Sequence, residues 1–263
     1  MKDERERFLK KIKRTNRFVT IWRLLIIVII LVLWEVLARF HIINTFLASS
    51  PSDVFNTFIK LLNDGSLFRH IFVTLLEVLI SFVISSILGI IIATLLWNSR
   101  TLARIVDPYL TILNSLPKVA LGPLIIIIIG ASKFSIIVMA LLISTFVTII
   151  NIYHSFLNTD SNYIILLKSM SASKLDLFLK AVLPSNIINI INTLKVNISM
   201  NYIGVIMGEL LVSKEGLGYL IMYGSQVFNI NLVITSVVVL AILSYLMYIV
   251  VELIEKYFKK KLG

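Results

Sequence analysis

The chain has 263 residues, of which 58% are hydrophobic, and its mean hydropathy is +0.96. Soluble domains are only about half apolar, so this composition indicates an all-α integral membrane protein. The absence of cysteine excludes disulfides and thiolate metal sites, and His41, His70 and His154 are too scattered to predict a metal site. A net charge of +11 is typical of a membrane protein that contacts anionic lipid head groups, and we do not expect nucleic-acid binding.

Residues 1–23 form a basic N-terminal segment, predicted to be cytoplasmic, that precedes an apolar run at residues 24–38. This run has the length of a signal-peptide core, and Ala48-Ser49-Ser50 is a weak cleavage candidate. We favour a retained first span, because Glu35 and Arg39 lie four residues apart at its end. After it, Pro51 and an apolar stripe up to Leu62 predict a short helix at the membrane interface.

About 20 apolar residues cross the hydrocarbon core of a bilayer. With 24–38 as the first, we predict six spans in one transmembrane domain at residues 24–263, the other five at about 70–97, 107–130, 134–154, 187–212 and 232–251. Pro108, Pro117 and Pro123 interrupt the third span, which we expect to be broken or kinked and to face the interior of the bundle. If both termini lie in the cytoplasm, the segments between spans on the cytoplasmic side and the two terminal segments together hold 18 of the 25 Lys and Arg residues. The positive-inside rule predicts such an excess on the cytoplasmic side.

Residues 161–184 are too polar to cross a membrane and read as a cytoplasmic helix-turn-helix. Ser171-Ala172-Ser173 is a small-residue break between the two helices, and Pro184 ends the second helix or starts the next. The segment is predicted to be a docking knob for a soluble partner, although the pattern alone also fits an ordinary solvated loop. The apolar positions at helical spacing are Ile164, Leu167 and Met170 in the first helix, and Leu175, Phe178 and Leu179 in the second.

The fifth span is the most polar. At 100° per residue, five small or polar residues fall within one arc of about 80°: Thr193, Asn197, Asn201, Gly204 and Gly208. Amide side chains in a membrane must face protein or a wet path, so these residues are candidates to line a translocation path. Helix–helix packing concentrates the same residue types and fits the pattern equally well.

The chain has no phosphate-binding loop and neither of the H-E-x-x-H and G-x-S-x-G motifs, so we predict no catalytic residues. If the protein does energy-driven work, a partner subunit hydrolyses the nucleotide.

Four segments, in order along the chain, resemble the permease subunits of ATP-binding-cassette (ABC) importers of the nitrate, taurine, aliphatic sulfonate and vitamin-precursor branch. They are SPSDVFNTFIKLL, NSLPKVALGPLIIIIIG, MSASKLDLFLKAVLP and GVIMGELLVSKEGLGYLI, the last carrying Glu209 and Gly216-Leu217-Gly218. The family signature E-A-A, three residues, Gly is replaced here by Ile165-Leu166-Leu167 and Ser171, while the spacing to Pro184 is kept.

The resemblance implies a type I importer permease fold in the plasma membrane, with no cofactor of its own. Its implied partners are a second permease copy, two cytoplasmic ATPase subunits that bind the ATP, and an extracytoplasmic binding protein that delivers a small polar or anionic solute. The sequence does not name that solute. The residues expected to dock the ATPase are Lys168, Ser171, Ala172, Ser173, Lys174, Leu175, Phe178 and Pro184.

Two other classes of function remain as alternatives. A secondary transporter or channel working without ATP would need paired ionisable groups deep in the membrane, and from sequence Lys118 and Lys195 lie there without a clear acidic partner. A membrane scaffold would make the polar stripe and the broken span accidental.

Overall fold

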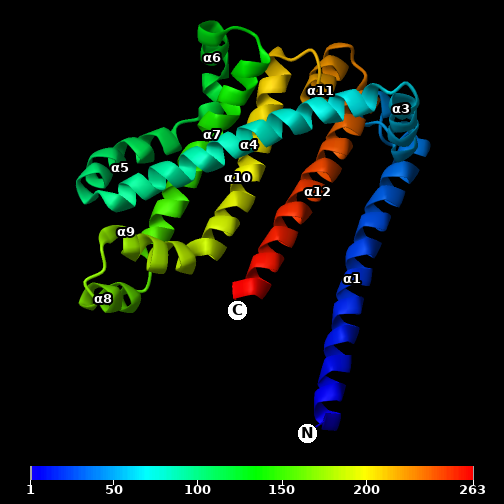
Figure 1. Cartoon of the computed structure of the whole chain (residues 1–263). Helices are drawn as coiled ribbons and strands as arrows, with labels where there is room; N and C mark the ends of the chain where they lie inside the picture. Colours follow the sequence, from blue (N-terminus) through cyan, green and yellow to red (C-terminus); the bar gives the residue numbers. More distant parts are fainter. Residues whose placement is uncertain (1, 263) are drawn as a thin grey trace.

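The computed structural model describes the backbone of residues 2–262, and the side chains of residues 14, 15, 17–23 and 25–260. The predicted basic segment at 1–23 therefore lies partly outside the described side chains. All elements in the described range are helices, and no strand occurs among them (Figure 1).

The longer helices have these bounds: α1 Lys2–Arg39, α3 Pro51–Asn63, α4 Ser66–Asn98, α5 Arg100–Ser115, α7 Lys133–Leu157, α10 Leu183–Val212 and α12 Ile230–Leu262. The shorter elements are α2 Thr45–Ala48, a 3₁₀ turn Lys118–Leu121, α6 Gly122–Ile129, α8 Ser161–Ser169, α9 Lys174–Leu177, a π turn Phe178–Val182 and α11 Leu217–Gln226.

Local sequence explains where several of these helices begin. The Ser50 hydroxyl accepts a hydrogen bond from the Asp53 N–H and Pro51 occupies the first turn, so α3 starts where the sequence predicts. Ser132 and Ser135 form a reciprocal capping box that starts α7. These caps satisfy backbone N–H groups that a membrane could not hydrate.

Five helices in the described range are long and apolar enough to cross a membrane, and a sixth span is present if the bent pair of α5 and the 3₁₀ turn with α6 counts as one. The two parts of this pair meet at 85°, at Leu116-Pro117, so the third span is broken as predicted. Its start differs from the prediction. Ser99 caps α5 directly after α4 ends, so the expected connection at 98–107 is helical and Pro108 stands inside α5.

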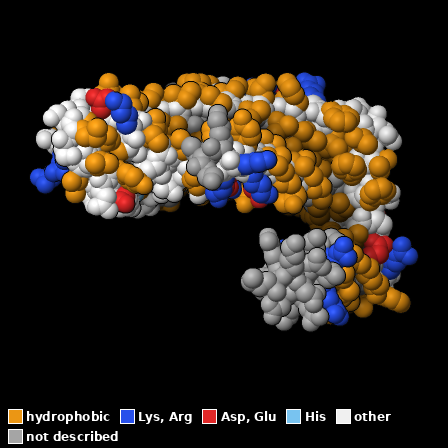
Figure 2. Space-filling model, turned by 60° about the horizontal axis from the view of Figure 1, so that its bottom comes forward, with side chains coloured by type: hydrophobic (Ala, Val, Ile, Leu, Met, Phe, Trp, Pro, Cys, Tyr) orange, Lys and Arg blue, Asp and Glu red, His pale blue; other side chains and the backbone are white. Residues whose placement is uncertain are grey.

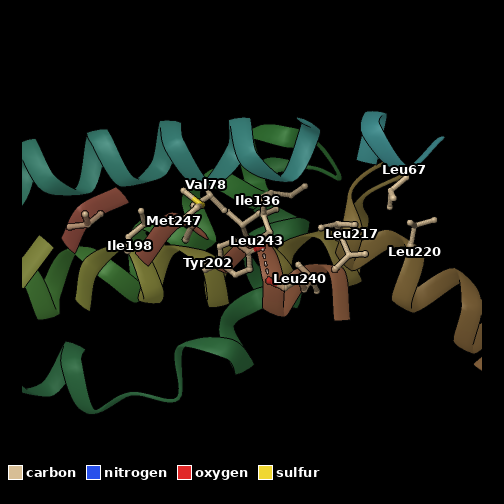
Figure 3. Packing of buried hydrophobic residues seen from close by; sticks show 14 of the residues in the cluster. Leu67, Val78, Ile136, Ile198, Tyr202, Leu217, Leu220, Leu240, Leu243 and Met247 are labelled. Atoms are coloured by element: carbon tan, nitrogen blue, oxygen red, sulfur yellow. Dashed lines mark hydrogen bonds between the residues drawn. The ribbon is translucent and has the colours of Figure 1, made fainter. Parts of the chain in front are cut away.

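The centre of the molecule is a three-helix arrangement in which α10 packs along α7 and α4. Val78, Ile136 and Val205 are almost fully buried where these helices meet. Leu240 and Leu243 of α12 close the cluster from the other side, and the Tyr202 hydroxyl donates to the Leu240 carbonyl at 3.3 Å (Figure 3).

The helix α1 stands apart from this core. It reaches α3 through Glu35, whose carboxylate accepts from the Ser52 N–H at 3.1 Å and from the Ser52 hydroxyl at 2.9 Å. Its apolar side chains from Phe18 to Leu33 are largely exposed, as expected for a helix surrounded by lipid. The surface along the body is also largely hydrophobic, with Lys and Arg in small groups (Figure 2).

The two ends of the molecule differ. Both termini lie on the side of the bundle that carries α8 and α9, while α3, α6 and α11 lie at the opposite end (Figure 1). This arrangement puts the predicted docking knob on the same side as the basic N- and C-terminal segments.

Candidate functional site

Within the knob, residues 161–182 form α8, a turn, α9 and the π turn. Asp160 caps α8 by accepting from the Asn162 N–H at 2.9 Å, and Ser173 caps α9 through the Asp176 N–H at 3.2 Å. The break predicted at residues 171–173 is therefore the turn between the helices.

The turn after α8 has the geometry of a Schellman motif. The Ser171 N–H donates to the Lys168 carbonyl at 2.9 Å and the Ala172 N–H to the Leu167 carbonyl at 3.0 Å. Ser171 has a φ of 58°, the left-handed region that glycine normally occupies in this motif. The glycine of the family signature aligns with Ser171, so this chain keeps the turn but carries a side chain where it is strained.

An aromatic cluster holds the knob against the spans. The Phe178 ring lies 5.2 Å from the Trp97 ring of α4 and 5.4 Å from the Phe156 ring of α7, measured between centroids. The Lys174 ammonium donates to the Asn98 carbonyl. Phe178 is therefore half-buried by contacts within its own chain, and its docking to an ATPase stays a prediction.

The outward side of the knob exposes large apolar side chains. Leu175 is 67% exposed and Met170 is 71% exposed, although both belong to helical stripes that normally pack against something. Of the other predicted docking residues, Lys168, Ser171, Ser173 and Lys174 are exposed and Ala172 is half-buried. The exposed apolar residues of the knob are Tyr163, Ile165, Leu166, Met170, Leu175 and Leu179.

Pro184 stands in the first turn of α10, where the helical path bends out of the knob into the span (Figure 1). α9, the π turn and α10 form one helical run from Lys174 to Val212. A proline inside a helix lacks an N–H and crowds the carbonyl four residues earlier, which here belongs to Lys180 in the π turn. The wider turn accommodates the proline, so the knob continues into the fifth span.

The polar stripe of the fifth span faces α4 and α7. The Asn197 side-chain N–H donates to the Thr148 hydroxyl at 2.8 Å, and its carbonyl oxygen accepts from the Ser85 hydroxyl at 2.9 Å. Asn201 accepts from the Ser144 hydroxyl at 3.1 Å and donates to Ser85 at 3.0 Å. All five side chains in this network are fully buried, so the two amides join three helices.

The glycines of the stripe serve close packing. A methyl group on Gly204 would lie 2.4 Å from the Cα of Ala140, and one on Gly208 would lie 2.9 Å from the Cα of Ile136. Thr193 is buried on the same helix, with its hydroxyl bonded to the Asn189 carbonyl at 3.0 Å. The five predicted path residues thus lie inside the helix bundle of this chain rather than on an open surface, as the packing alternative describes.

At the opposite end, three consecutive backbone N–H groups of one turn are held by side chains from two spans. The Gly216 N–H donates to His70 Nδ1 at 3.0 Å, the Leu217 N–H to the Thr74 hydroxyl at 2.9 Å, and the Gly218 N–H to the Glu209 carboxylate at 2.6 Å. Gly216 has a φ of 105°, and a methyl group there would overlap the Glu209 carboxylate. The turn belongs to one of the four segments that resemble the family, but no sequence pattern predicts its contacts with His70 and Thr74 of α4.

Next to this turn, Glu215 pairs with the guanidinium of Arg69 and, at 3.5 Å, with the ammonium of Lys133. The Arg69 contact lowers the pKa of the Glu215 carboxyl. These ion pairs tie the loop before α11 to the ends of α4 and α7.

Lys195 has an acidic partner, contrary to the reading from sequence. The described part of α12 continues to Leu262, and its Glu255 forms an ion pair with Lys195 and another with Lys259. Glu77 of α4 is also fully buried. No group of three His, Cys, Asp or Glu residues that could hold a metal occurs in the described range.

These features, a bundle of apolar spans and an exposed apolar knob, fit a membrane subunit that works with a soluble partner. The sequence matches the family of binding-protein-dependent transport system inner membrane components over residues 85–263. The chain belongs to this family. It is a multi-pass permease subunit, and the prediction of a transport permease is confirmed.

Curated relatives of this permease come from several organisms. It is 29% identical over 87% of its length to a probable ABC transporter permease protein of Haemophilus influenzae, 93% of which is covered. It is 31% identical over 74% of its length to the formylaminopyrimidine transport permease protein ThiX of Halalkalibacterium halodurans, 77% of which is covered. It is 25% identical over 89% of its length to the putative aliphatic sulfonates transport permease protein SsuC of Bacillus subtilis, 84% of which is covered.

The fold also matches a solved structure. A chain of the MetNI methionine ABC transporter, in an inward-facing conformation, superimposes with a TM-score of 0.65. The match has 20% sequence identity and covers 76% of this permease and 97% of that chain, so it supports the fold alone. The predicted all-α permease fold is confirmed.

Proposed function

We propose that the permease works as a homodimer that imports a small polar or anionic solute. An extracytoplasmic binding protein delivers the solute, and two cytoplasmic ABC ATPase subunits drive its transport. The exposed apolar side chains of the knob support the proposal that an ATPase docks there. Six large apolar side chains in water would be unfavourable unless a partner covers them. The permease itself uses no cofactor, and ATP stays on the ATPase subunits.

The docking contacts divide into two groups. Leu175, together with Met170 and Leu179, contacts a groove of the ATPase, because more than half of each side chain is exposed. Phe178 and Pro184 position the knob, the first through its contacts with Trp97 and Phe156 and the second at the start of α10. Ser171, Ala172 and Ser173 set the angle between α8 and α9.

The solute is of the class carried by the named relatives, an organic sulfonate or a pyrimidine vitamin precursor, with nitrate and taurine as further candidates. The stripe from Thr193 to Gly208 contributes to the path indirectly, by fixing α10 against α4 and α7. An ATP-independent secondary transporter is not favoured, because the family is one of binding-protein-dependent transport.

The test compares Leu175→Ala with Leu253→Ala, a matched change at a 59% exposed leucine of α12 outside the knob. Burying a leucine contributes about 1.5–3 kcal/mol, and Leu175 is already one-third covered, so we expect its loss to weaken ATPase binding by about 1–2 kcal/mol, or roughly 5- to 30-fold. Binding is measured with purified permease and its ATPase, and transport by ATP-driven uptake into proteoliposomes.

Leu253→Ala should leave both measurements unchanged. Phe178→Ala should instead lower the thermal stability of the isolated permease, because it opens the cluster with Trp97 and Phe156. Equal ATPase affinity for Leu175→Ala and the unchanged protein would refute the docking assignment.

A further inference from the structure

A cavity of about 810 Å³ lies between the knob and the ends of two spans. Its walls come from the end of α4, the start of α5, the end of α7 and the inner side of α8 and α9. It lies on the side of the knob that faces the spans, away from the proposed ATPase contact at Leu175, which does not line it.

Three basic residues line this cavity: Arg100, Lys168 and Lys174. No acidic residue is among its lining, and in the described part of the chain neither Arg100 nor Lys168 has a carboxylate partner. Lys174 donates to the Asn98 carbonyl, a neutral group, and so keeps its full charge in the cavity. Three like charges around one space repel each other unless an anion lies between them.

The rest of the wall has a polar and an apolar part. The polar part comes from Asn98, Ser99 and Thr101, and the apolar part includes Leu157 and the half-buried ring of Trp97. A molecule with an anionic head and a hydrocarbon chain can contact the basic residues and the apolar part at the same time.

The position of the cavity also suits a lipid with an anionic head group. It opens where the apolar helices α4 and α7 end, at Asn98 and Leu157, which is the depth at which lipid head groups meet hydrocarbon. Basic pockets between helix ends on the cytoplasmic side of membrane proteins are suited to anionic phospholipid head groups.

We propose that this cavity binds one anionic phospholipid, with its phosphate between Arg100 and Lys168 and an acyl chain along Trp97 and Leu157. The bound lipid fills the space between the knob and the spans and thereby fixes the angle of the knob. The inference stands independently of the solute carried and of which ATPase docks.

The test measures lipid binding to the purified full-length permease in detergent by native mass spectrometry and thermal shift. Phosphatidylglycerol is titrated against phosphatidylcholine with the same acyl chains, and inorganic phosphate alone forms a third arm. We expect saturable binding of one phosphatidylglycerol, a rise in the unfolding temperature with that lipid, and neither effect with phosphatidylcholine or inorganic phosphate.

Arg100→Gln and Lys168→Gln should each weaken phosphatidylglycerol binding about fivefold, because a basic residue near an anionic head group contributes on that order. The control is Arg104→Gln, which removes the same charge from an exposed position one turn further along α5 that does not line the cavity. All three residues are exposed, so the variants should fold.

Equal binding of both lipids, or the same loss in Arg104→Gln as in Arg100→Gln, would overturn the proposal, since either result means unspecific surface attraction. Binding of inorganic phosphate as strong as that of the lipid would also overturn it, in favour of a free anion. If Arg100→Gln and Lys168→Gln lose ATPase binding but keep phosphatidylglycerol binding, the cavity belongs to the protein interface instead.

Discussion

The contact between Gly89 of α4 and Thr148 of α7 allows a sharp test of how the bundle is packed. A methyl group added by Gly89→Ala would lie 2.4 Å from the Thr148 Cγ2 atom, roughly 1 Å closer than the 3.4–4 Å of ordinary contacts. Overpacking of this kind costs about 1–3 kcal/mol. We therefore expect Gly89→Ala to lower the free energy of unfolding by that amount.

The obstructing atom is the end of a side chain, so a second change can remove it. Thr148→Ser deletes Cγ2 and keeps the hydroxyl that accepts from Asn197 at 2.8 Å. The nearest remaining atom is then the Cβ of residue 148 at 3.0 Å, which needs a shift of only a few tenths of an ångström. The double variant Gly89→Ala/Thr148→Ser should recover most of the loss and retain the cost of one missing methyl, about 0.8 kcal/mol.

Gly204 provides a comparison in which a second substitution should not restore stability. The added methyl of Gly204→Ala would meet the Cα of Ala140, which belongs to the backbone of α7. Ala140→Gly leaves that atom in place, so Gly204→Ala/Ala140→Gly should stay as unstable as Gly204→Ala or become less stable.

The assay is reversible unfolding of the purified permease in mixed micelles, read as free energies in two double-variant cycles. Coupling of at least about 0.5 kcal/mol is expected for the Gly89–Thr148 cycle, and no favourable coupling for the Gly204–Ala140 cycle. If Gly204→Ala is as stable as the unchanged protein but abolishes transport, the packing explanation is wrong and Gly204 lines the translocation path instead.

Two other predictions concern the ends of the molecule. Ser171→Gly should raise the unfolding temperature, because it relieves a left-handed backbone that costs an L-residue about 1–2 kcal/mol, whereas the control Ser169→Gly, at the last residue of α8 and without a positive φ, should not raise it. Arg69 lowers the pKa of Glu215, so the ion pair stabilises the fold above the ordinary carboxyl pKa of 4.5 and is lost as the pH falls below it. Thermal scans from about pH 6 to about pH 3 should therefore show a steeper loss for the unchanged protein than for Glu215→Gln, and equal slopes would contradict this role.

Periodicity and caps predicted much of the helical pattern. The start of α3 at Pro51, the turn at residues 171–173 and the broken third span all follow from local signals that need no tertiary information. The common face of Asn197, Asn201 and Gly204 follows in the same way from the 100° step of a helix.

What that face contacts could not be predicted, because one helix has the same pattern whether its neighbour is water or another helix. The partners of Asn197 and Asn201 lie more than 45 residues away in the chain, in α4 and α7. The contacts of Phe178 with Trp97 and Phe156 could not be predicted for the same reason, since its stripe also includes the exposed Leu175. The partner of Lys195 was missed because Glu255 lies in a polar stretch that reads as a tail although it continues α12.

The uninterrupted helical run from Lys174 to Val212 has a mechanical consequence. Its 39 residues make up about 58 Å of helix at 1.5 Å per residue, measured along a path that bends between the knob and α10 (Figure 1), and they connect the knob at one end to the Glu209 clamp on the Gly216–Gly218 turn at the other. A continuous helix does not shorten, so a displacement of the knob reaches the far turn as a tilt or rotation of α10. The π turn at Phe178–Val182 lies next to this bend, and it sets how much of the displacement is lost to bending before it enters the membrane.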